Sequence, residues 1–163
     1  MQVRTWKRIL AGSLALNLLL ALSLAGSAWV RESRADVTAS GEELSPYMAT
    51  MQHLTHKLGL ALQAKNAPLA GFYIEEIEET ATIIQKKFPT YDKIAVGQLM
   101  NAMLVPSIGP LDKSIKASNW AISNAGYTKL IDSCNGCHAA AQHPFIKITV
   151  PTQNPFNQSF SPQ

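Results

Sequence analysis

The chain has 163 residues, of which 47% are hydrophobic and 15% are charged, and it contains two cysteines. This length is enough for one domain with a buried core. The formal net charge of +3 comes from the amino-terminal end, because five of the 14 basic and one of the 11 acidic residues precede residue 36. The remaining nine basic and ten acidic residues give a net charge of −1. This balance offers no argument for nucleic-acid binding, so we expect no nucleic-acid partner.

Residues 1–35 have the pattern of an export segment. Three basic residues among the first eight precede residues 9–30, which carry no charge and are rich in Leu and Ala. About 20 apolar residues can span a bilayer, whereas the apolar core of a signal peptide is usually shorter, and residues 26–28 and 33–35 both resemble cleavage sites. The segment therefore fits a cleaved signal peptide and also an uncleaved inner-membrane anchor. In both cases the positive flank predicts a periplasmic location for the rest of the chain.

A polar linker over residues 36–43 precedes a first helix that we expect over about residues 44–65. Apolar residues recur at helical spacing along this helix, as Leu44, Tyr47, Met48, Met51, Leu54, Leu58 and Leu62. At about 100° per residue, Met51 lies at the centre of the apolar stripe, whereas His53 and His56 lie about 160° and 140° away from it. The pattern therefore places Met51 in the core and both histidines outside the stripe.

A second helix is predicted to begin after Asn66, a suitable cap, and to end before Pro89, with Pro68 in its first turn. Its predicted buried stripe consists of Leu69, Phe72, Tyr73, Ile77 and Ile84. Four carboxylates lie outside this stripe, namely Glu75, Glu76, Glu78 and Glu79. A paired-carboxylate or di-iron site is one interpretation of them, but the Glu-x-x-His motifs of di-iron bundles are absent from the sequence. We therefore interpret the four carboxylates as a solvated acidic face.

The connection over residues 89–106 is long enough to hold a short helix within residues 94–105. A third helix is expected over about residues 107–117, and Ser118 or Asn119 can cap a fourth. One face of the fourth helix carries Trp120, Tyr127, Ile131, Cys134 and His138. The cysteine region is thus predicted on the core face of a helix and not on a loop.

Both cysteines fall in the sequence Cys134-Asn135-Gly136-Cys137-His138, which is the motif for covalent attachment of a c-type haem. A spacing of three residues places both thiols on one face of a helix, where they can form thioethers with the two vinyl groups of one porphyrin. The imidazole of His138 follows directly and can bind the iron as the proximal ligand. Asn135 and Gly136 are too small to obstruct a flat macrocycle. The motif therefore predicts one covalently bound haem c.

Three other interpretations of the two cysteines explain the sequence less well. A structural zinc site needs four ligands, and the chain has no second cysteine pair. A thioredoxin-like redox pair is expected near a βαβ unit, whereas the pattern around these cysteines is helical. A disulfide can form in an oxidising compartment, but it leaves His138 without a role.

A tail over residues 144–163 follows the haem motif, and its four prolines argue against a further helix. An extended segment lying on the bundle is indicated by Phe145, Ile146, Ile148 and Val150. Two further aromatic residues, Phe156 and Phe160, either cover an edge of the haem or pack loosely on another apolar surface.

The helix order, the export segment and the haem motif together resemble those of the class II c-type cytochromes, the cytochrome c-prime group. Over roughly residues 44–160 the chain is also similar to a branch of small exported bacterial monohaem cytochromes. The strings that carry this likeness are Met51-Gln52, His56-Lys57-Leu58-Gly59, Phe72-Tyr73-Ile74-Glu75-Glu76-Ile77-Glu78-Glu79, Cys134-Asn135-Gly136-Cys137-His138 and Pro155-Phe156-Asn157-Gln158. The long tail after the haem helix departs from the usual c-prime pattern.

The resemblance implies an antiparallel four-helix bundle with one haem over residues 44–143. Six-coordinate class II members carry electrons, whereas five-coordinate members bind small gases such as nitric oxide. We therefore expect an exported electron carrier with redox-protein partners, not an enzyme, since the cofactor supplies the chemistry. A gas-binding haem protein and a haem-bearing interaction subunit of a redox complex are the alternatives, and a homodimer is compatible with each.

The sixth ligand of the iron separates a carrier from a gas binder. In an up-down-up-down bundle the first and fourth helices are antiparallel, so the haem motif should lie level with Met48 and Met51. A methionine thioether as distal ligand would favour low-spin iron and a higher potential than a second histidine. Methionines at helical spacing are also common core residues, so ligation by Met51, an open iron site and ligation by His56 all stay open. His143 follows His138 by five residues and cannot easily reach the opposite face of the iron.

Overall fold

The computed structural model of the protein describes residues 43–162. Within these residues the chain forms five α-helices and no β-strand: α2 (Ser45–Gln63), α3 (Ala67–Lys87), α4 (Val96–Met103), α5 (Val105–Lys116) and α6 (Trp120–Ala140). The all-helical class predicted from the sequence is confirmed. The export or anchor segment predicted over residues 1–35 lies outside the described residues. A membrane-spanning helix of sufficient length and hydropathy is not found in the described part.

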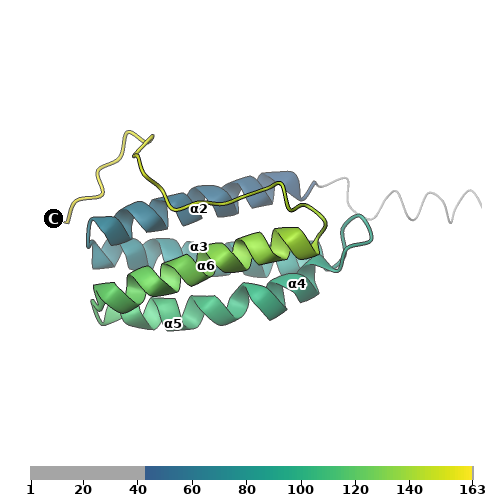
Figure 1. The fold of residues 1–163 in the computed structure, drawn as a ribbon, viewed down its shortest axis with the longest axis horizontal. Helices are drawn as coiled ribbons and strands as arrows, with labels where there is room; N and C mark the ends of the chain where they lie inside the picture. Colours follow the sequence, from purple (N-terminus) through teal and green to yellow (C-terminus); the bar gives the residue numbers. More distant parts are fainter. Residues whose placement is uncertain (1–42, 163) are drawn as a thin grey trace, which may run out of the picture. The chain divides into compact units, whose positions relative to one another are not determined.

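The helices lie side by side in a bundle-like array (Figure 1). α2 packs against α3, α3 packs against α4 and α5, and α6 packs against α4 and α5 and more sparsely against α2. α4 and α5 follow one another with only Leu104 between them. α4 is the short helix that the sequence allowed within residues 94–105, and it forms one wall of the site described below.

Helix boundaries follow from local side-chain chemistry. The side-chain oxygen of Asn66 accepts a hydrogen bond from the Leu69 amide at 3.2 Å, and Asn119 caps α6 in the same way. Both caps agree with the sequence, which left Ser118 and Asn119 as alternatives for the second. Pro106 has no N–H to donate to a carbonyl one turn earlier, so the helix is interrupted at Leu104 and α5 restarts with a proline in its first turn.

A non-glycine residue in the left-handed region follows the end of each of three helices, α2, α5 and α6, namely Lys65, Ser118 and Gln142. At the end of α6 the Gln142 amide donates to the Ala139 carbonyl, and the His143 amide donates to the His138 carbonyl at 2.7 Å. These are the paired bonds of a Schellman motif. The chain therefore reverses direction directly after the Cys-x-x-Cys-His motif.

The core is built mainly from aliphatic side chains that are almost fully buried: Leu58, Leu62, Ile74, Ile77, Ile84, Leu111, Ile115 and Leu130, with Phe88. The predicted burial of Phe72 is wrong, because this side chain is 52% exposed. Phe72 precedes Ile74 by two residues, which places the two side chains about 160° apart around the helix. Ile74 takes the core position.

The tail is extended and runs back over the helices (Figure 1). It is held by side chains of α2 and of the following turn: Gln63 donates to the Pro151 carbonyl at 2.8 Å, and Asn66 donates to the Phe160 carbonyl at 3.1 Å. Pro151 and Phe160 are buried. Of the four apolar residues at the start of the tail, Phe145, Ile146 and Val150 are exposed, whereas Ile148 packs against the core.

Gly59 is required where α2, α6 and the tail meet. A Cβ atom at this position would lie 2.7 Å from the Cγ of Pro151 and 2.7 Å from the Cζ of Tyr127, and real Cβ atoms do not approach so closely. We expect Gly59→Ala to lower the free energy of unfolding in urea by about 1–3 kcal/mol, since a packed interior must shift. Gly71→Ala in α3 is the matched control because no atom lies within 4 Å of its added methyl group. The control should gain up to about 1 kcal/mol from helix propensity, and equal gains in both variants would contradict the packing argument.

Candidate functional site

A cavity of about 410 Å³ is lined by α2, residues 91–104 and the carboxyl-terminal part of α6 with the start of the tail. Its lining is mainly apolar and includes Leu44, Met48, Met51, Ile94, Val96, Leu99, Met100, Leu104, Ile146 and Ile148. Cys134, Cys137 and His138 line the same cavity. The structure thus brings together the thiols and the imidazole of the motif with the two methionines of α2. The volume falls in the range of small-molecule and cofactor sites, about 300–1,000 Å³.

The two cysteines lie one helical turn apart on α6 and are half-buried against the core. Gly136 between them faces α4, where an added Cβ would lie 2.7 Å from the Cε of Met103. The absence of a side chain at Gly136 therefore leaves room for the terminal methyl group of Met103.

Both cysteines are free thiols, and their surroundings favour the neutral form. Burial, and next the neighbouring Cys137, raises the pKa of Cys134 to about 11. Burial also raises the pKa of Cys137. Thiol–disulfide exchange depends on a lowered thiol pKa, so this environment is unlike that of a thioredoxin-like redox pair.

The imidazole of His138 is oriented by the tail. Its Nδ1 atom lies 3.1 Å from the carbonyl oxygen of Ile146. Because a carbonyl oxygen can only accept, this hydrogen bond requires the proton on Nδ1 and makes Nε2 the nitrogen that is available to bind a metal.

His143 also lines the cavity, which sequence reasoning did not anticipate. Its Nδ1 atom lies 2.7 Å from the carbonyl oxygen of Ala141. The Schellman motif that follows Ala140 turns His143 back toward the end of α6. Glycine usually occupies the left-handed position of such a motif, and Gln142 gives no such signal in the sequence.

On α2 the structure separates the methionines from the histidines. Met51 is 6% exposed and Met48 is half-buried, and both line the cavity. His53 and His56 are not among the lining residues and instead contact the ring of Phe156, with ring centroids 4.8 Å and 5.2 Å apart. Burial, and next the charges of Lys57 and His56, lowers the pKa of His53.

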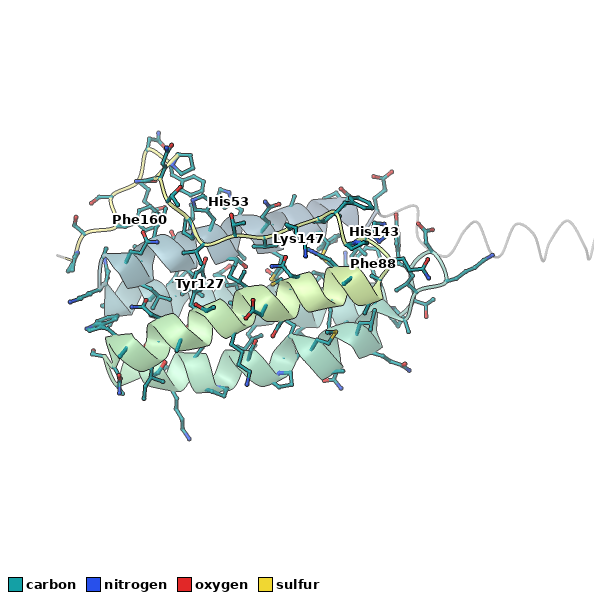
Figure 2. The ribbon with its side chains drawn as sticks, viewed as in Figure 1. His53, Phe88, Tyr127, His143, Lys147 and Phe160 are labelled. Carbon is teal, nitrogen blue, oxygen red and sulfur yellow. The ribbon has the colours of Figure 1, made fainter. Side chains whose placement is uncertain are left out.

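The aromatic residues of the tail lie away from the Cys-x-x-Cys-His motif. Neither Phe156 nor Phe160 lines the cavity, and Phe160 packs near Tyr73 of α3. Figure 2 shows Phe160 toward the opposite end of the molecule from His143. Of the two alternatives for these rings, packing on another surface is therefore correct, and the tail residues at the cavity are Ile146 and Ile148.

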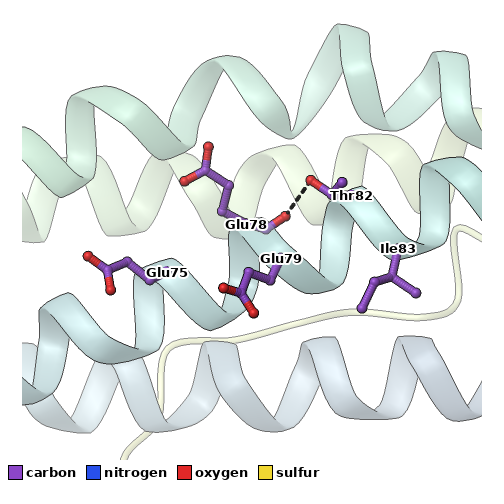
Figure 3. Close-up of a pocket in the computed structure, with 5 residues that line it drawn as sticks. All are labelled: Glu75, Glu78, Glu79, Thr82 and Ile83. Carbon is purple, nitrogen blue, oxygen red and sulfur yellow. Dashed lines mark hydrogen bonds between the residues drawn. The ribbon is translucent and has the colours of Figure 1, made fainter.

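The acidic residues of α3 form a separate, open hollow. Glu75, Glu78 and Glu79 project from α3 and line it together with Thr82 and Ile83 (Figure 3). The three carboxylates are exposed. Among residues 43–162, no group of three or more His, Cys, Asp and Glu side chains is placed to hold a metal ion. The hollow fits the solvated acidic face that the sequence indicates.

Comparison with protein families, with curated proteins and with solved structures found no match for this chain. What the cavity can hold is therefore argued from its donors. The motif contributes two neutral thiols one turn apart and an imidazole with Nε2 available, and α2 contributes two thioethers, in a mainly apolar lining. Further possible donors in the lining are Met100, His143 and Asp92. The set fits a flat, largely apolar macrocycle that is attached through two sulfurs and carries a metal ion bound by the imidazole.

Proposed function

We propose that the protein is an exported c-type cytochrome that carries electrons through one haem attached to Cys134 and Cys137, with His138 as the proximal ligand. One observation supports this most strongly. Both thiols and the imidazole line a single apolar cavity and face Met48 and Met51 of α2. Neutral thiols in an apolar pocket fit the addition of each S–H group across a vinyl group.

The residues of the chain would have separate roles in electron transfer. Cys134 and Cys137 would hold the haem on α6. His138 would bind the iron through Nε2 while its Nδ1–H group donates a hydrogen bond to the Ile146 carbonyl. The apolar residues from α2 and α4 would exclude water from the ring. When bound, the haem supplies one-electron chemistry, and the protein tunes it through the axial ligands and the polarity of the pocket.

The class II architecture is part of this proposal. α4 and α5 together would take the place of the third helix in an antiparallel four-helix bundle, between α3 and α6 in chain order. Such a bundle places the first turns of its first helix beside the last turns of its fourth. The presence of Met48, Met51 and Cys137 in one cavity agrees with that arrangement.

A five-coordinate gas-binding protein is the second candidate. Its support is the apolar α2 wall, on which neither His53 nor His56 reaches the cavity. Without histidine there, the face of the iron opposite His138 would be open unless a methionine binds it. A mainly apolar pocket of this kind suits a neutral diatomic gas.

Acid–acetone extraction tests the proposed function. Protein purified from cells that mature c-type cytochromes should keep its haem on the polypeptide, because thioether bonds survive the treatment. A low-spin spectrum with mixed axial ligands in both oxidation states supports the carrier. A high-spin ferrous form that takes up carbon monoxide supports the gas binder. Freely extractable pigment, or haem-loaded protein found in the cytosol after fractionation, would contradict the proposed exported c-type cytochrome.

A further inference from the structure

Asn135, between the two cysteines, makes contacts that haem attachment does not require. Its Nδ2 atom donates to the carbonyl oxygen of Ile148 at 3.0 Å, and its Oδ1 atom accepts from the amide of Ile148 at 2.8 Å. One side chain thus satisfies both backbone polar groups of a residue 13 positions later in the chain. Two parallel bonds fix both the position and the rotation of the tail at that point.

We call the two hydrogen bonds between Asn135 and Ile148 the Asn135 clamp. Ile146, whose carbonyl orients His138, lies two positions before Ile148. Ile146 accepts from His138 Nδ1 at 3.1 Å, and its own amide donates to the His143 carbonyl at 3.0 Å. Its side chain is 41% exposed, and the neighbouring Lys147 is also exposed. Core burial therefore does not hold the Ile146 carbonyl in place. Its position depends on the turn at His143 on one side and on the Asn135 clamp on the other.

We propose that Asn135 is a positioning residue for His138: by clamping Ile148 it holds the Ile146 carbonyl against Nδ1, so that Nε2 faces the cavity. The inference rests on the proposed function, because it concerns the axial ligand of a haem. Hydrogen bonding from the second ring nitrogen of a histidine to a fixed acceptor orients the ring and raises its basicity as a ligand. A more basic ligand favours ferric iron, so the clamp lowers the reduction potential.

The experiment compares Asn135→Ala and Asn135→Leu with the parent holoprotein. Both substitutes are good helix formers, and leucine shares the branched shape of asparagine, so α6 should fold in at least one variant. Gln63→Ala is the matched control, since it removes a different tail hydrogen bond, to the carbonyl of Pro151, which follows Ile148 on the side away from Ile146. Haem retention is recorded on one portion of each protein after acid–acetone extraction, and the reduction potential is measured on a separate, untreated portion of the folded holoprotein.

In both Asn135 variants, amide hydrogen exchange over residues 145–150 should become about tenfold faster, because two hydrogen bonds are lost. The reduction potential should shift upward in the same variants. Gln63→Ala should speed exchange near Pro151 and leave the potential at the parent value. If the parent retains haem but the Asn135 variants keep its potential or its exchange rates, the positioning role is overturned while the cytochrome proposal stands. A parent without covalent haem overturns both.

Discussion

Replacing Cys134 and Cys137 together with alanine is expected to abolish covalent haem attachment. The two thiols line the same wall of the cavity and are the only cysteines of the chain, so no other sulfur can form a thioether. Each single variant should keep at most one thioether. The measurement is the haem that stays with the polypeptide after acid–acetone extraction, together with the intact mass of the protein.

Ser133→Ala is the control for this experiment. Ser133 precedes Cys134 on α6, its hydroxyl donates to the Lys129 carbonyl at 2.8 Å, and it does not line the cavity. The control should bind haem at the parent level. If the double alanine variant keeps its pigment after extraction, the assignment of both cysteines is wrong.

Met51→Leu is expected to remove the sixth ligand of the iron, if the protein is a six-coordinate carrier. Methionine ligation gives a charge-transfer band in near-infrared magnetic circular dichroism, and the leucine side chain has no thioether to produce it. Because leucine and methionine have similar volumes, the variant should lose less than about 1.5 kcal/mol of stability. The loss of the band would then report ligation and not unfolding.

Met48→Leu and Met51→Ala separate ligation from packing. Met48→Leu should keep the band, since we expect Met51 and not Met48 to bind the iron. Met51→Ala should lose the band and also about 2–5 kcal/mol of stability, because Met51 is almost fully buried. If the parent and Met51→Leu share one low-spin spectrum, Met51 is not the ligand. A high-spin parent spectrum favours the gas-binding alternative.

Features that depend on neighbouring residues were predictable from the sequence. The helical repeat of α2 placed Met51, Leu58 and Leu62 on the buried face, and the structure buries all three. Asn66 and Asn119 cap their helices because their short polar side chains reach the free amides of the first turn. The Cys-x-x-Cys-His motif is likewise local, since helical spacing alone places both thiols on one face.

The helical repeat predicts burial less reliably where two large apolar residues lie two positions apart in the sequence, since only one of them can face the core. The pattern assigns Phe72 to the buried stripe of α3, but Ile74, which the predicted stripe does not contain, takes the core position. A large aromatic side chain counts as strongly apolar in any pattern, while its burial is decided by what packs against the helix. On a repeat of 3.6 residues, an error of two positions turns a side chain to the opposite face.

The sequence by itself determined the all-helical class, the main helix boundaries and the residues that we propose for haem attachment. Only the tertiary structure decided what surrounds them: residues 91–104 as a wall of the cavity, the Ile146 carbonyl at His138, and the clamp between Asn135 and Ile148. It also decided that Phe156 packs on His53 and His56 and not at the cavity. The physical reason is the distance along the chain between the residues that interact. Helix repeats and caps act over about four residues, whereas the tail is positioned by contacts with residues 8 to 103 positions away in the chain.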